Sequence, residues 1–169
     1  MDFKIRDEES KDMEQVREIL RATFPTDAES KLVDALRANG KAIISLVAAA
    51  GSDQVLGHIL FSPVSTTPPH EAKGIGLAPV AVHPDFQSQR IGSQLIREGL
   101  CLCKEHGYDY CVVLGSPEYY PRFGFEKASN FGLQNEYGVD DEFMLIRFSK
   151  RELADSLVSY APEFVQFSV

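Results

Sequence analysis

The chain has 169 residues, of which 44% are hydrophobic and 25% are charged, a composition typical of one globular domain. Its net charge of −8 and pI near 5.0 argue against a nucleic-acid-binding protein that works by neutralising phosphates. No apolar run is long enough to cross a bilayer, and the charged start MDFKIRDEESKDM lacks the apolar core of a signal peptide. We therefore expect a cytoplasmic protein with neither nucleic acid nor a membrane as a partner.

The three cysteines agree with that compartment, because their number is odd and no CxxC pair occurs. Cys101 and Cys103 are two residues apart on a predicted helix and point to different faces, while Cys111 lies in an apolar run. We expect all three to act as small hydrophobic residues and expect no metal site.

The chain begins with a predicted strand and helix. Alternation at 3–6 indicates a half-buried strand. Ser10 and Glu14 suggest a capping box for a helix that begins near Lys11, and Pro25 ends that helix.

A second helix and a hairpin follow. The helix is predicted to begin at Thr26 or Asp27 and to stop at Asn39-Gly40. The apolar runs 42–50 and 54–64 flank a Gly-Ser-Asp turn, so we expect an antiparallel hairpin there.

The second half alternates strands and helices. The expected elements are a loop at 65–73, a strand at 74–84, a helix at 91–106, a strand at 108–115, a short helix capped by Ser116, strands within FGFEKA and EFMLIRFS, and a final helix in RELADSLVSY. Pro79 inside the first of these strands removes a donor and indicates a bulge. The strand–helix–strand unit over 77–115 predicts a parallel pair with a right-handed crossover, and hence an α/β or α+β fold in a single domain, 1–169.

The turn between that strand and helix, HPDFQSQRIGSQLI at 83–96, is rich in polar residues. It could be an ordinary structural turn, but a helix start also offers unpaired N–H groups and a positive dipole end to an anion. The residues that supply successive amides are Gln87, Ser88, Gln89, Arg90, Ile91, Gly92 and Ser93. The chain carries neither a Walker A motif nor a complete GxGxxG fingerprint.

The segment LAPVAVHPDFQSQRIGSQLI resembles the acetyl-CoA-binding motif of the GNAT superfamily of N-acyltransferases, in which a V-x-V-x-P strand leads to Q/R-x-x-G-x-G/A and a helix. Gln87 matches the first motif position and Gly92 the last, whereas Arg90 stands where glycine is usual. The later VVLGSPEYYPRFGFEKAS is similar to the family's strand, short helix and G-F. The pairing of the two segments is closest to the bacterial YhbS-like acetyltransferases, and the resemblance covers roughly 3–148.

This resemblance implies a GNAT-like domain: a central, mixed, mostly antiparallel twisted sheet with one splayed parallel strand pair, flanked by helices. It implies that amides near Val80, Ala81 and Val82 bind the pantetheine of acetyl-CoA and polarise its thioester, while the turn holds the pyrophosphate. Acetyl-CoA is then a co-substrate, and no metal is needed.

By the same resemblance Tyr120 matches the tyrosine that protonates the leaving thiolate, because it lies four residues before Gly124. A phenol with a pKa of about 10 can donate without being ionised at neutral pH. Packing alone is the other interpretation, with Tyr119 as its equal. The general base is open: the candidates by residue type are Glu71, His70, Glu118, His58 and His83, and a water chain could also serve.

Two functions remain open. The first is an N-acetyltransferase (an acyltransferase of groups other than amino-acyl groups) that acts on a primary amine of a small molecule or peptide in a ternary complex. The second is a catalytically idle acyl-CoA-binding or regulatory module on the same fold, which Arg90 and the absence of an obvious base would favour. We also leave open whether two copies form a homodimer.

Overall fold

The computed structural model describes residues 2–169, and the chain divides into two compact units. Unit 1 comprises the chain up to Phe61, Ala78–Gly99 and Pro162–Val169. Unit 2 comprises Ser62–Leu77 and Leu100–Ala161. The single domain 1–169 expected from the sequence remains a prediction.

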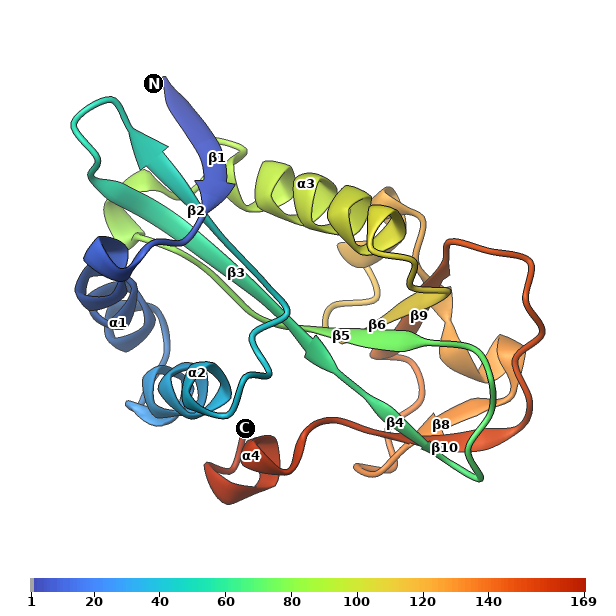
Figure 1. The fold of residues 1–169 in the computed structure, drawn as a ribbon. Coiled ribbons are helices and arrows are strands. Elements are labelled where there is room, and N and C mark those ends of the chain that lie inside the picture. The colour runs from blue at the N-terminus through green and yellow to red at the C-terminus, as the bar shows by residue number, and fades with distance from the viewer. Residues whose placement is uncertain (1) are drawn as a thin grey trace. The chain divides into compact units, whose positions relative to one another are not determined.

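Unit 1 contains an antiparallel sheet with the strand order β1-β2-β3-β5 (Figure 1). Its strands are β1 (Phe3–Asp7), β2 (Ile44–Ala50), the greater part of β3 (Val55–Pro63) and the end of β5 (Gly74–Val82). β2 and β3 pair in the predicted hairpin, with Ile44 opposite Phe61. Both strands are almost entirely buried, as a sheet with helices on its faces requires.

The helices of unit 1 are α1 (Met13–Thr23), α2 (Ala28–Ala38), the first part of α3 (Ile91–Glu105) and α4 (Pro162–Gln166). Each long helix buries one apolar stripe, such as Val16, Ile19 and Leu20 on α1. α3 packs closely on β3, because a Cβ added at Gly57 would lie 3.1 Å from side-chain atoms of both Ile91 and Leu95.

The predicted capping box of the first helix is wrong. A 3₁₀ turn, Ser10–Asp12, precedes α1, and the Glu9 N–H donates to Asp12 Oδ2 at 2.8 Å. Asp12 also binds the Arg6 guanidinium at 2.7 and 3.0 Å. This contact with β1 places the cap on Glu9 and Asp12 instead of Ser10 and Glu14.

Unit 2 contains two sheets. The first has the order β5-β6-β9-β7 and includes the start of β5, β6 (Tyr110–Leu114), β9 (Phe143–Arg147) and β7 (Glu126–Lys127). The second has the order β4-β10-β8 and consists of β4 (Ser65–Thr67), β10 (Ser156–Ser159) and β8 (Leu133–Asn135) (Figure 1). The parallel pair predicted from the sequence is β5 with β6.

The small second sheet corrects two predictions. The segment 65–73, expected to be a loop, begins with β4, and the helix expected in RELADSLVSY is the strand β10. β10 pairs with β4 on one side and with β8 on the other. Long-range pairing of this kind leaves no local signal in the sequence. The contacts of β10 with β4 and β8 therefore override the helical propensity of this segment.

Three 3₁₀ helices complete the described chain beyond α1: Pro84–Phe86, Tyr120–Phe123 and Ala128–Phe131. None of the helices found in residues 2–169 is both long and apolar enough to cross a membrane.

Candidate functional site

Strand β5 pairs with β6 over only part of its length. The parallel register runs from Gly74 opposite Tyr110 to Leu77 opposite Val113, while β5 itself continues to Val82. The pairing stops directly before Ala78-Pro79, and Pro79 has no N–H to continue a ladder. The last residues of β5 therefore keep backbone groups that β6 does not use.

The direction of those groups follows from a single hydrogen bond in unit 1. The His83 N–H donates to the Leu56 carbonyl of β3 at 2.8 Å. Because amides alternate in direction along a strand, the Ala81 N–H points toward β3 as well, whereas those of Val80 and Val82 point away from it. Val80 and Val82 are half-buried, and Ala81 between them is buried.

The turn after β5 has a fixed conformation. His83 caps the 3₁₀ helix Pro84–Phe86, with its Nδ1 accepting from the Asp85 N–H at 3.1 Å. The Gln87 amide donates to the Val82 carbonyl at 3.2 Å and so ties the turn back to the strand. Ser88 and Arg90 both have positive φ, 63° and 66°.

The conformation of the turn shows why glycine is usual in the family motif at the position that Arg90 occupies. Arg90 occupies the left-handed region that glycine enters without strain, which is the reason that glycine is usual there. A residue with a Cβ pays a conformational cost in that region. Nothing in the sequence signals the left-handed Ser88, since it is neither Gly nor Asn.

The turn leaves a run of donors unused. Within the described residues, no hydrogen bond is found from the backbone N–H groups of 87–93, a run that ends in the first turn of α3. Unpaired backbone N–H groups at the start of a helix are suited to an anion. Ser93 Oγ and the Gln94 N–H both bind the Arg90 carbonyl, at 3.2 and 3.1 Å, and fix the start of the helix.

Gly92 is not required by packing within unit 1. A Cβ there would meet only a Val82 methyl at 3.5 Å, an ordinary contact, and its φ is not positive. The space beside position 92 would therefore accept a side chain as far as the protein's own atoms are concerned.

In unit 2, the candidate acid Tyr120 lies at the start of a 3₁₀ helix and is 8% exposed. Its ring covers Gly115, where a Cβ would lie 2.3 Å from Cε2. Phe125 packs edge-on against it, with ring centroids 5.7 Å apart. Burial raises the pKa of Tyr120 to about 12, so the phenol keeps its proton throughout the physiological range.

Tyr119 has a different environment. The Arg122 guanidinium lies 4.4 Å over its ring, and Arg122 Nε donates to the Tyr119 carbonyl at 2.8 Å. Tyr119 therefore serves the local turn, and the two tyrosines, equal in the sequence, differ in the structure.

The candidates for a base are dispersed. His83 caps a turn, Glu71 pairs with Arg151 at 3.2 Å, and the N–H of the exposed Glu118 donates to Ser116 Oγ. His70 lies beside the Tyr110 ring, with centroids 6.2 Å apart. None of these contacts marks one of them as the base.

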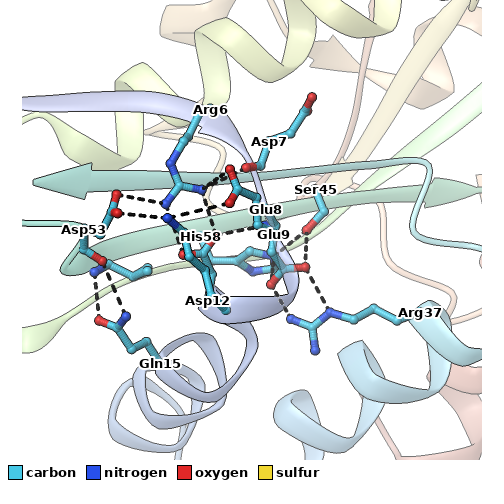
Figure 2. A network of polar contacts seen from close by, with 12 residues as sticks. Arg6, Asp7, Glu8, Glu9, Asp12, Gln15, Arg37, Ser45, Asp53 and His58 are labelled. Atoms are coloured by element: carbon cyan, nitrogen blue, oxygen red, sulfur yellow. Dashed lines mark hydrogen bonds and ion pairs between the residues drawn. The ribbon is translucent and has the colours of Figure 1, made fainter.

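His58 belongs to a buried polar network in unit 1, which we call the Glu8 network: Glu8, Arg37, Ser45 and His58 (Figure 2). Burial, with the Arg37 charge adding to it, lowers the pKa of His58 to about 3. A fully buried imidazole of this kind is neutral and has no access to a substrate, so His58 is not a suitable base.

The network also contains a serine and a histidine at 2.8 Å, but their order excludes a nucleophilic triad. Ser45 Oγ donates its only proton to Glu8 Oε1 at 3.1 Å, so His58 Nε2–H donates to Ser45. In a triad the serine proton goes to histidine and the acid binds the other ring nitrogen. The network is a structural feature.

Cys103 and Cys111 are buried, as expected for small hydrophobic residues, but the expectation is wrong for Cys101, which lies on the exposed face of α3; all three are free thiols. Among residues 2–169 no group of three or more His, Cys, Asp or Glu side chains could hold a metal ion.

These features resemble those of a known family, and the comparisons agree. A sequence model described as "Acetyltransferase (GNAT) family" matches residues 13–125. The chain belongs to the GNAT acetyltransferase family. It is 38% identical over 152 residues to YhbS of Escherichia coli (strain K12), named an uncharacterized N-acetyltransferase, with 88% of this chain and 90% of YhbS covered. It is 32% identical over 134 residues to YjhQ of the same strain, which has a similar name, covering 78% and 74%.

Two crystal structures extend the similarity to the GNAT fold. That of YhbS from Escherichia coli in complex with CoA has a TM-score of 0.89 and 36% identity, covering 96% of this chain and 92% of that one. That of a GNAT acetyltransferase from Brucella melitensis in complex with acetyl-CoA has a TM-score of 0.81 and 35% identity, covering 96% and 98%. The family and the mixed, mostly antiparallel fold predicted from the sequence are confirmed.

Proposed function

We propose that this GNAT protein is an acetyl-CoA-dependent N-acetyltransferase that moves an acetyl group to a primary amine of a small molecule or peptide by direct attack in a ternary complex. The observation that carries the proposal is the run of unused N–H groups at 87–93, shaped by the left-handed Ser88 and Arg90. CoA and acetyl-CoA are bound in the two crystal structures of relatives. The GNAT family membership supports acyl transfer.

In this proposal the turn binds the pyrophosphate through its N–H groups and the positive end of α3. The guanidinium of Arg90 adds a charge-assisted contact to a phosphate. The amides of Val80 and Val82 bind the pantetheine and polarise the thioester carbonyl, in the way that an oxyanion hole does.

The thioester supplies the acetyl group: the neutral amine nitrogen bonds to the carbonyl carbon, the C–S bond breaks, the nitrogen loses one proton and the sulfur gains one. Tyr120 donates to that sulfur. Because its pKa of about 12 lies above the 8.5 or so of an ordinary thiol, the phenol keeps its proton until charge has developed on sulfur. Its main contribution is then a hydrogen bond to the departing thiolate, and the thiolate takes its final proton from water. Water takes the amine proton, in keeping with the dispersed candidates for a base.

The binding half of the proposal is tested by calorimetry with CoA. We expect Gly92→Val to weaken binding, since its side chain would occupy the space next to the amides. Gly51→Val is the matched control, because Gly51 has no neighbouring atom within 4 Å of an added Cβ and lies in the hairpin turn. If a folded Gly92→Val protein bound CoA with the same affinity as the wild type, the turn would not be the CoA-binding site.

The catalytic half is tested by screening primary amines with acetyl-CoA and measuring thiol release. With the amine so identified, Tyr120→Phe should lower kcat and kcat/KM together by about 10²–10⁴-fold while CoA affinity is kept. Tyr119→Phe is the control and should change little. Full kcat in Tyr120→Phe would exclude the acid role, and an absence of turnover with every amine would favour an idle CoA-binding module.

A further inference from the structure

The small sheet of unit 2 presents a row of side chains to solvent. β10 lies between β4 and β8 (Figure 1), and its residue Leu157 is opposite Thr67 of β4 on one side and Gln134 of β8 on the other. Because directly opposite residues project to the same face of a sheet, these three side chains form one row. All three are exposed, Leu157 by 38%. The row therefore has an apolar centre with a polar group on each side.

Asp155 extends this surface along β10. It lies two residues before Leu157, and alternate residues of a strand share a face. The Ser156 N–H donates to the Gly132 carbonyl at 3.1 Å, so the pairing of β10 with the β8 segment continues to this point. A Cβ added at Gly132 would lie 2.0 Å from Asp155 Oδ1. Glycine at position 132 thus leaves the space that the Asp155 carboxylate occupies.

The four exposed residues line one hollow, which we call the Asp155 hollow. Its volume is about 400 Å³, within the range of small-molecule sites. Among the described residues that line it, Asp155 is the one that carries a charge. Within residues 2–169, no hydrogen bond or ion pair is found for the side chains of Thr67, Gln134 or Asp155. The hollow therefore combines an uncompensated carboxylate with two unused polar groups and the apolar Leu157.

A primary ammonium group matches this set of side chains. It carries one positive charge and three N–H donors, and the Asp155 carboxylate, the Thr67 hydroxyl and the Gln134 amide oxygen are acceptors. Hydrogen bonds between an ammonium and a carboxylate are among the strong ones, and Leu157 offers apolar surface to an alkyl chain. We infer that the Asp155 hollow binds a small primary amine in its ammonium form, with the nitrogen at Asp155 and the alkyl chain on Leu157.

This site differs in its chemistry from the acceptor position of the proposed acetyl transfer. Direct attack on a thioester needs a neutral amine with a free electron pair, whereas the hollow selects the protonated form. All of its lining residues belong to unit 2, and the inference does not depend on the transfer. The net charge of −8 favours the approach of a cation.

The test is an NMR titration of the ¹⁵N-labelled full chain with butylammonium chloride and with butan-1-ol, which has the same alkyl chain but no charge. KCl keeps the ionic strength constant. The amides of Gly132 and Gln134 should shift and saturate with butylammonium, with a dissociation constant about tenfold or more below that for the alcohol. Asp155→Asn, which is nearly isosteric and exposed, should remove this preference.

Two further variants make the test specific. Glu152→Gln is the matched control, because it removes the same charge from an exposed residue that does not line the hollow, and it should keep the preference. Leu157→Ala should weaken the binding of butylammonium more than that of methylammonium, which has no chain to place on Leu157.

Each of four results would overturn the inference. These are shifts that never saturate, equal dissociation constants for butylammonium and butan-1-ol, and an unchanged preference in Asp155→Asn. The fourth is a loss in Glu152→Gln as large as that in Asp155→Asn, which would mean that the net charge of the protein attracts the cation and the hollow does not.

Discussion

Two polar regions of unit 1 use their hydrogen-bonding groups in opposite ways. In the Glu8 network the carboxylate accepts from Arg37 Nε at 3.0 Å, from Arg37 Nη2 and from Ser45 Oγ, and its side chain is 4% exposed (Figure 2). The turn at 87–93 contains a run of backbone donors, none of which is used within the described chain.

This difference in hydrogen bonding distinguishes residues that stabilise the fold from residues that are free to bind a ligand. Buried polar groups are tolerated only when they are paired, so the Glu8 network contributes to holding β1, α2 and the hairpin together. Unused donors at a solvent-facing turn cost the fold little, because water satisfies them until an anion takes its place. Substitutions in the network should therefore change the free energy of unfolding, and substitutions in the turn should change ligand affinity.

The largest effect is expected for Glu8→Gln. The amide is nearly isosteric but leaves the Arg37 guanidinium, whose side chain is 11% exposed, without its main counter-ion. Breaking a buried pair from one side costs about 3–5 kcal/mol of unfolding free energy, measured here by urea denaturation. CoA affinity at a temperature where the variant is folded should not change.

Glu14→Gln is the matched control, since Glu14 pairs with Arg17 at 3.0 Å but its side chain is 65% exposed. Such a surface pair contributes about 0–1 kcal/mol. A loss for Glu8→Gln as small as that of the control would contradict the structural role of the network.

The next effect is a dependence on pH. His58 has a pKa of about 3 in the folded protein and about 6.5 when unfolded, so below pH 6.5 the unfolded chain binds a proton that the folded chain does not. This stability is fully present well above pH 6.5 and is lost as pH falls toward 3, by about 1.6 kcal/mol between pH 6.5 and 5. Denaturation curves at those two pH values measure it.

His58→Gln should abolish most of this dependence while its amide still reaches Ser45. Between pH 5 and 6.5 the carboxyl groups of Asp12 and Glu163 do not titrate, because hydrogen bonds from Arg6 and Lys41 lower their pKa values. An equal pH dependence in His58→Gln and the wild type would place the titrating group elsewhere.

A smaller effect is expected in the turn. Arg90→Ala should lose about 1–3 kcal/mol of CoA binding, as charge-assisted contacts do, and much less of pantetheine binding. Calorimetry with both ligands measures the difference. The same loss with both ligands would show that Arg90 acts on the turn and not on a phosphate.

The smallest effect is expected for Arg90→Gly, which removes the cost of a Cβ at φ 66° but adds backbone entropy to the unfolded state. The unfolding free energy should change by less than about 1 kcal/mol relative to the wild type and should exceed that of Arg90→Ala. If Arg90→Gly had a lower unfolding free energy than Arg90→Ala, the left-handed conformation at position 90 would not be the source of strain.

Motif order and periodicity were sufficient for much of the fold. The stripe Ile91, Leu95, Ile96 and Cys103 predicted α3 and its buried face, and the runs around Gly51 predicted the β2–β3 hairpin. Tyr120 and Gly92 could be proposed from their motif positions. Their environments could not, because Gly115 under the Tyr120 ring and Val82 beside Gly92 come from other elements.

By itself, then, the sequence determined the family, the strand–turn–helix that carries the motif, and the residue types available for chemistry, since these depend on local spacing. Tertiary structure alone decided which groups are paired. It buried His58 against Arg37, made 156–159 a strand by placing it between β4 and β8, and brought Glu136 to Tyr160. Such contacts join residues far apart in the chain, and their free energies exceed the local propensities from which a single sequence is interpreted.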